Sequence, residues 1–249
     1  MPYMPGVDMS GSDVNDVIHF FFLLDASGSM SGQSILTLNE AMANVLNEIC
    51  YEADKKEVTP VVHVLSFNNS ITWLCGTTAT HGVDAHQLSW NDIGATGGTN
   101  TAGAIDSILE GLSRRHLGHH TYPPIIILIT DGYSNDASAT SAAIKKLTDR
   151  QKSIRIAVGV NGYNPTELEA FASMGTVNLN DGLGNVTDST VQRLIFPVDQ
   201  ADKLAQVISD AAVSSLISSR LMGPVSSESG SLEEDPASIV INQNDPDWI

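Results

Sequence analysis

The chain has 249 residues, of which 42% are hydrophobic, 16% charged and 6% aromatic, so it can bury a sizeable core and wholesale disorder is excluded. It carries 12 Lys and Arg against 29 Asp and Glu, a formal net charge of −17, so nucleic-acid phosphates and anionic membrane surfaces would repel it. The two cysteines, Cys50 and Cys75, are too few for a disulfide framework.

The first 16 residues lack the basic and apolar regions of a secretion signal, and we expect them to be a flexible segment. The apolar run that follows, 17–24, is too short to span a bilayer. We therefore expect a cytoplasmic protein with one α/β domain over 17–222.

Apolar runs without alternation, such as 17–24 and 124–130, are typical of strands buried on both faces of a parallel sheet. Apolar residues at helical spacing follow each of them. In chain order, the pattern predicts a strand over 17–24, a helix over 35–53, strands over 60–67 and 70–75, a helix over 102–112, a strand over 124–130, a helix over 138–150, a strand over 154–160, a helix over 165–173, a strand over 176–179 and a helix over 199–219. Residues 73–92 carry no motif that identifies their role.

This alternation predicts an α/β fold: a doubly wound, mainly parallel sheet with helices on both faces and one antiparallel edge strand, 70–75. From Gly223 the composition turns to Ser, Glu, Pro and Asn, with six acids and no Lys or Arg. We expect 223–249 to be an acidic, disordered tail, although its last two residues, Trp248 and Ile249, could dock on a surface.

Three polar loops follow or precede predicted elements. The first buried strand runs into Asp25-Ala26-Ser27-Gly28-Ser29, where Gly28 is expected to let the chain fold back tightly. The second runs into Thr130-Asp131-Gly132, and Gly97-Gly98-Thr99-Asn100-Thr101 stands just before a helix. Carboxylates and hydroxyls suit a hard cation, and ligands on such folds bind at the carboxyl ends of strands. Asp25, Ser27, Ser29, Thr99 and Asp131 are therefore the candidate ligands of one metal ion.

In order and spacing, DASGS, GGTNT and ITDG resemble the metal-ion-dependent adhesion site of von Willebrand factor A (VWA) domains, over roughly residues 17 to 217. The resemblance implies a Rossmann-like VWA fold, with Asp25, Ser27 and Ser29 in the first motif, Thr99 in the second and Asp131 in the third. The start DASGSMSG looks most like bacterial cytosolic proteins of the tellurium-resistance TerY type, which are associated with kinase and phosphatase partners.

Several residues and motifs also have a purely structural interpretation. Asn100 or Thr101 is expected to cap the helix over 102–112. Thr101 also competes with Thr99 as a ligand, and we favour Thr99 as the ligand and Thr101 as the cap. His116, His119 and His120 are interpreted as residues of a helix end rather than a metal site, since no carboxylate or thiol accompanies them. Residues 181–188 lack the order of a calcium loop and are interpreted as a plain loop.

The main hypothesis is a non-enzymatic, metal-dependent interaction module, in which Mg²⁺, or else Mn²⁺ or Ca²⁺, binds an Asp or Glu of a partner protein. The partner would be a protein, possible examples being a kinase or phosphatase in a stress-response system. The alternative is a Mg²⁺-dependent phosphohydrolase. Dehalogenase-type phosphatases, however, need a second acid two residues after the first, and here that position holds Ser27.

Overall fold

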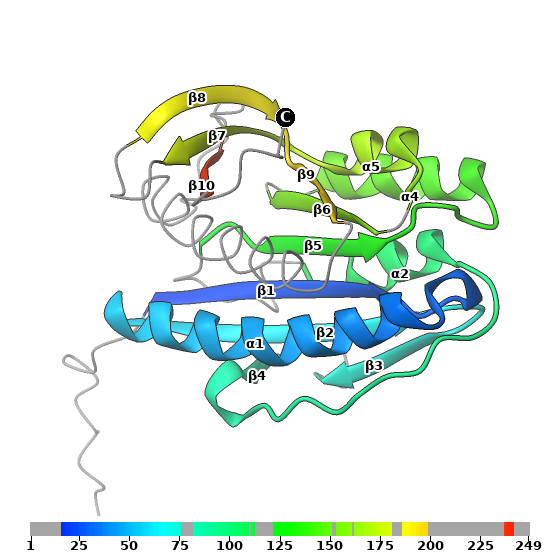
Figure 1. Cartoon of the computed structure of the whole chain (residues 1–249), viewed down its shortest axis with the longest axis horizontal. Coiled ribbons are helices and arrows are strands. Elements are labelled where there is room, and N and C mark those ends of the chain that lie inside the picture. Colours follow the sequence, from blue (N-terminus) through cyan, green and yellow to red (C-terminus); the bar gives the residue numbers. More distant parts are fainter. Residues whose placement is uncertain are drawn as a thin grey trace, which may run out of the picture.

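The computed structural model describes residues 16–75, 82–109, 111–112, 122–150, 153–160, 162–180, 186–198 and 237–241. Within them a seven-stranded sheet runs through the centre of the molecule (Figure 1), with the main strand order β3-β2-β1-β5-β6-β9. Its strands are β1 (Asp16–Asp25), β2 (Val58–Phe67), β3 (Ile71–Cys75), β4 (Val83–Asp84), β5 (Ile125–Thr130), β6 (Ile154–Val160) and β9 (Ile195–Val198).

Across the sheet, the neighbouring strands β2, β1, β5, β6 and β9 are parallel. β3 is an antiparallel edge strand, as the sequence predicts. The short β4 also pairs with β2 in antiparallel sense, beyond an irregularity in the β2–β3 pairing. β1 lies at the centre because its apolar side chains fill both faces of the sheet: Phe20 and Phe22 contact one core, Phe21 and Leu23 the other.

Helices cover both faces of this sheet. Helix α1 (Gln33–Lys55) packs on the face of Phe20 and Phe22, while α2 (Thr101–Ile108), α4 (Ala137–Arg150) and α5 (Pro165–Phe171) pack on the other face. Two short 3-10 turns are present, η1 (Gly28–Met30) and η2 (Ala85–Gln87). No helix in the described ranges combines the length and apolar character that crossing a membrane requires.

A second sheet departs from the sequence expectations. Its strands are β7 (Met174–Asn180), β8 (Val186–Arg193) and β10 (Ala237–Ile241), in the order β10-β7-β8. Residues 186–188 were expected in a plain loop but begin β8, which pairs antiparallel with β7. Residues 237–241 were expected to be disordered but form β10, because an apolar Ile239-Val240-Ile241 run gives the tail a segment that can pair with β7. The rest of 223–249 and the helix expected over 199–219 lie outside the described residues.

Candidate metal centre

The candidate site lies at the edge of the sheet where β1 and β5 end. The two strands are parallel neighbours, with Leu24 in register with Ile129, so Asp25 and Thr130 leave the sheet side by side. The chain crosses from β1 to β2 on one side, and β5 stands on the other side of β1. This is the point where the strand order reverses, which is where open α/β sheets bind their ligands.

Asp25 is the centre of a buried hydrogen-bond network. Its side chain is 0% exposed. Oδ1 accepts the main-chain N–H of Ser27 at 2.8 Å, and Oδ2 accepts the Thr130 hydroxyl at 2.5 Å. Burial raises the pKa of the Asp25 carboxyl, and the negative charge of Asp131 adds to that rise. The ionised form of Asp25 would therefore gain from a cation beside it.

Ser27 and Ser29 follow on the loop that opens η1. Their hydroxyl oxygens lie 3.0 Å apart, with Ser27 buried and Ser29 exposed. Gly28 lets the chain turn tightly without a positive φ. Its N–H donates to the Gly97 carbonyl at 2.8 Å, and an added Cβ would stand 3.2 Å from that oxygen. Gly28 thus permits a close approach of two loops.

Thr99 is buried, and its loop is held from two sides. Gly97 has φ +80°, a conformation that favours glycine, and the N–H of Gly98 donates to Asn69 Oδ1 at 2.8 Å. On the other side, the Asn135 N–H donates to the Thr99 carbonyl at 2.9 Å. The loops after β2 and β5 therefore fix the main chain of Thr99.

The prediction that Thr101 caps the following helix is wrong. Asn100 is the N-cap of α2, and its side-chain oxygen accepts the N–H of Gly103 at 2.9 Å. Thr101 is the first helical residue, and its buried hydroxyl has no hydrogen-bond partner among the described residues.

Asp131 is 6% exposed and begins a loop that is pinned at several points. Gly132, with φ +74°, donates its N–H to the Thr130 hydroxyl at 2.9 Å, so Thr130 joins Asp25 to this turn. The Asn164 N–H donates to the Asp131 carbonyl at 2.9 Å. Ser134 donates its hydroxyl to Glu167 at the start of α5, at 2.9 Å.

These residues fit a hard divalent cation. Asp25 and Asp131 are two buried carboxylates, close enough for the charge of Asp131 to raise the pKa of Asp25, and neither forms an ion pair within the described part of the chain. The described residues contain no group of three or more His, Cys, Asp and Glu arranged for a metal. A cation here would thus depend on two carboxylates completed by the hydroxyls of Ser27, Ser29 and Thr99. That these five side chains bind a metal stays a prediction.

The residues that support the site stand outside the three sequence motifs or were not among the candidate ligands. Thr130, Asn69 and Asn135 each bond to a loop far away in the chain. A signal existed only for Thr130, which directly precedes a motif acid. His116, His119 and His120, set aside above, lie outside the described residues.

Comparison with known proteins agrees with this arrangement. The family model of the von Willebrand factor type A domain matches residues 20–196. The human collagen alpha-6(VI) chain is 26% identical over 160 residues, which cover 63% of this chain and 7% of the collagen chain. The chain therefore spans a small part of the curated relative it matches.

Two solved structures share the fold at low identity. Proximal thread matrix protein 1 from the mussel byssus, with a zinc-occupied metal-ion-dependent adhesion site, is 16% identical over 80% of this chain and 46% of its own, with a TM-score of 0.52. The manganese-loaded TRAP protein of Plasmodium vivax is 16% identical over 78% of this chain and 72% of its own, with a TM-score of 0.54. The family match covers most of the chain, and the chain belongs to the von Willebrand factor type A domain family.

Proposed function

We propose that this chain is a metal-dependent protein-interaction module that binds an acidic side chain of a partner at the edge formed by β1 and β5. The observation that carries the proposal is the buried pair Asp25 and Asp131, which has hydroxyls around it and no opposite charge in the described structure. A divalent cation bound there supplies an open coordination position for a carboxylate oxygen.

The five candidate ligands differ in exposure, and this difference suggests which of them hold the ion and which faces a partner. Asp25, Ser27, Thr99 and Asp131 are buried, so they would hold the ion from inside the molecule. Ser29 is exposed and stands at the edge that a partner reaches. Mg²⁺ is the proposed ion, and Mn²⁺ or Ca²⁺ would fit the same oxygen donors.

Among the described residues, the rim around the site provides no cation of its own. The loop segments 25–36, 67–70, 94–103, 131–136 and 162–167 contain no Lys or Arg. A partner carboxylate would therefore meet no opposite charge at this rim except the ion, and the net charge of −17 would oppose it elsewhere. Binding of an acidic partner should depend wholly on the metal.

Tyr133 and Leu36 are large apolar side chains exposed in these segments, and Tyr133 is the one next to a candidate ligand. Its side chain is 60% exposed, and its N–H is directed to Asp131 Oδ1 at 3.4 Å, which places the residue next to the candidate ligand. We propose that the ring of Tyr133 packs against the partner, because a large exposed aromatic beside an ion-binding loop contributes contact area at low entropic cost.

The proposal extends to a cellular role. The DASGSMSG start resembles proteins of the tellurium-resistance type, and we propose a cytoplasmic, non-enzymatic adaptor for a kinase or phosphatase of a stress response. Incubation of the purified protein with nucleotides and phosphoesters in Mg²⁺ tests the absence of catalysis. Turnover that disappears in Asp25→Ala would contradict it.

The test of partner binding has two stages. The wild-type chain and Asp131→Ala serve as baits, with and without EDTA, and proteins retained only by the wild type with Mg²⁺ are identified by mass spectrometry. Each candidate is then purified and titrated directly, with its Asp and Glu residues changed one at a time to the amide. We expect one substitution to abolish binding.

Two variants of the chain separate the steps. Thr99→Ala should cost more free energy of partner binding than of folding, since it removes one buried hydroxyl ligand and leaves both carboxylates in place. Tyr133→Ala should keep metal affinity and weaken partner binding, whereas Tyr51→Ala, a similarly exposed tyrosine on α1, is the matched control and should change neither. Binding that persists in EDTA, or that tolerates every amide substitution, would overturn the proposal.

A further inference from the structure

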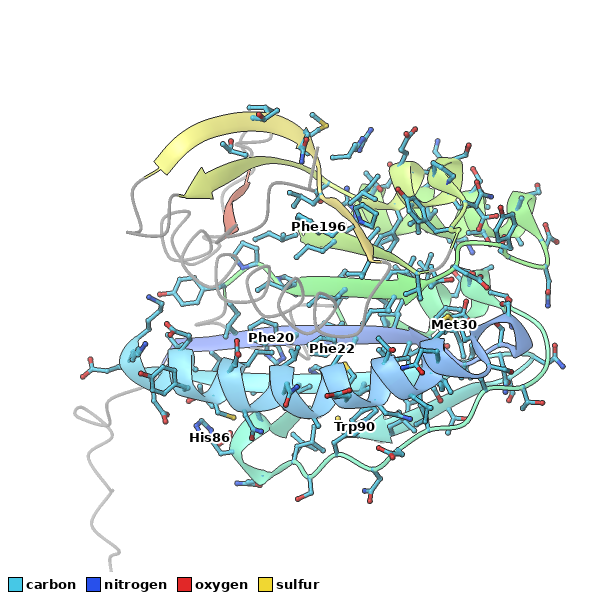
Figure 2. The ribbon with its side chains drawn as sticks, in the orientation of Figure 1. Phe20, Phe22, Met30, His86, Trp90 and Phe196 are labelled. Atoms are coloured by element: carbon cyan, nitrogen blue, oxygen red, sulfur yellow. The ribbon has the colours of Figure 1, made fainter. Side chains whose placement is uncertain are left out.

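One of the candidate ligands stands at the end of a long segment without helix or strand. Residues 88–99, which we call the strap, connect η2 to the site and end at Thr99. In Figure 1 the chain runs from β4 along the side of α1 to the end of the sheet where β1 and β5 stop. Figure 2 labels three residues along this course: His86 lies near one end of α1, Met30 near the other end and Trp90 between them.

The middle of the strap has little main-chain support. No backbone–backbone hydrogen bond among the described residues involves residues 89–95. Four side chains pack part of their surface against the core under α1, namely those of Leu88, Trp90, Ile93 and Ala95. Apolar packing is not directional. By itself it holds the strap against the core but fixes the position of the strap along α1 less well.

Asn39 of α1 supplies the missing directional contact. Its Nδ2 donates to the Ile93 carbonyl at 3.0 Å, and its Oδ1 accepts the Ile93 N–H at 3.0 Å. The amide thus pairs with the main chain as a neighbouring strand would, from a residue 54 positions away. Asn39 is 6% exposed and Ile93 is half-buried, so the amide of Asn39 itself lies away from water, where a lost partner is costly.

Three residues beyond Ile93, the hydrogen bonds of the strap resume and lead to the site. Thr96 donates its N–H to the Ala26 carbonyl at 2.8 Å, inside the Asp25 motif. Gly97 accepts from Gly28 at 2.8 Å, and Thr99 follows two residues later. A shift of the strap at Ile93 would therefore reach both the first and the second metal-binding loop.

We propose that Asn39 is a positioning residue of the metal site: it fixes the strap along α1 so that Thr99 and the Asp25 loop keep their relative places. This inference rests on the proposed function, because it assumes that these loops bind a cation. Residues outside the ligand shell that orient ligands change metal affinity about 10- to 100-fold when they are replaced.

The test measures Mn²⁺ affinity by calorimetry for the wild type and for Asn39→Ala. We expect about tenfold weaker binding in the variant. Asn47→Ala is the matched control, since Asn47 lies on the same helix, is exposed, and donates only to Ala43 of its own helix turn. It should bind Mn²⁺ as the wild type does.

Two further measurements separate positioning from general loss of stability. In the double variant Asn39→Ala/Thr99→Ala, the loss of Mn²⁺ affinity should be smaller than the product of the two single losses, because part of the effect of Asn39 passes through Thr99. Without metal, the amides of Asn100 and Asn135, which hydrogen-bond around Thr99, should exchange faster with solvent in Asn39→Ala than in Asn47→Ala.

If Asn39→Ala does not fold, Asn39→Asp takes its place, since it keeps the shape and the bond from the Ile93 N–H and replaces the donor with a carboxylate oxygen that repels the Ile93 carbonyl. Failure of the wild type to bind Mn²⁺ would contradict the proposed function. A wild type that binds Mn²⁺, with Asn39 variants within twofold of Asn47→Ala, would overturn the positioning role alone.

Discussion

Two pairs of aspartates, one beside the start of α1 and one at its end, differ in burial and in whether a cationic partner lies beside them. Asp25 and Asp131 are buried and have no ion-pair partner in the described structure. Asp54 and Asp84 share His86, whose Nδ1 lies 2.7 Å from Asp84 and whose Nε2 lies 3.0 Å from Asp54. Their hydrogen bonds and charges, that of Asp84 first, raise the pKa of His86.

The comparison shows what each pair is suited for. The Asp54–Asp84 pair carries its own titratable cation at the surface, so it serves the fold. The Asp25–Asp131 pair is held by the neutral hydroxyl of Thr130 and by main-chain N–H groups, which satisfy oxygen atoms without neutralising charge. A carboxylate pair that is bonded but not neutralised is suited to binding an external cation.

The largest expected effect comes from removing either carboxylate of the buried Asp25–Asp131 pair. Mg²⁺ or Mn²⁺ should raise the midpoint of thermal unfolding, because a ligand that binds only the folded chain stabilises it by about 2.7 kcal/mol at 100 times its Kd. Asp25→Ala and Asp131→Ala should each abolish that rise while staying folded. Scanning calorimetry with and without the ion is the measurement, and a mutant that responds like the wild type would remove that residue from the ligand set.

A third pair of titratable residues, His19 and His63, is buried and basic. His19 Nδ1 lies 3.0 Å from His63 Nε2, and the His63 ring stacks on Phe21 with 4.1 Å between centroids. Burial, helped by the charge of His19, lowers the pKa of His63 to about 3. Unfolding restores a pKa near 6.5, so the unfolded chain binds the extra proton and stability falls as pH drops from 6.5 toward 3.

His63→Phe, which keeps a ring against Phe21, should remove a part of this acid loss on the order of 2 kcal/mol. The measurement is the free energy of urea unfolding at pH 7 and at pH 4.5, without metal. An unchanged difference between the two pH values would show that His63 does not titrate on unfolding.

Thr130→Val tests whether the hydroxyl holds the buried pair. The change leaves Asp25 Oδ2 and the Gly132 N–H without their partner, which should cost about 1–3 kcal/mol of stability and weaken Mn²⁺ binding. Thr148→Val is the control, since its hydroxyl bonds only within α4. Equal losses of Mn²⁺ affinity in the two variants would deny Thr130 its role.

The smallest effect concerns the surface pair. Because the pKa of His86 is raised in the folded chain, its stabilisation is complete below pH 6.5 and is lost as pH rises through the folded pKa. His86 is exposed, so the step should stay under about 1 kcal/mol. Comparison of wild type and His86→Asn between pH 6 and 8.5 by urea unfolding measures it, and parallel curves would argue against stabilisation by the His86 contacts with Asp54 and Asp84.

Local patterns were enough to predict the parallel sheet and its motif loops. The apolar runs that become β1 and β5 report burial on both faces directly, and the motif acids follow them in the sequence. Long-range support was not predictable in this way. Asn39 resembles any polar residue of an amphipathic helix until Ile93 is placed beside it, and β10 needed a partner strand in a second sheet. Pairing across the fold, rather than propensity, decides such positions.

The bond between Thr130 and Asp25 joins residues 105 positions apart, and this separation sets when the site comes into existence. During synthesis the ribosome releases the Asp25 loop long before β5 is made, so the nascent chain exposes one motif without the other. Closing so long a loop is among the slow events of folding. Ion capture would therefore come at the end of assembly, and an ion-loaded molecule would be one whose central strands have already paired.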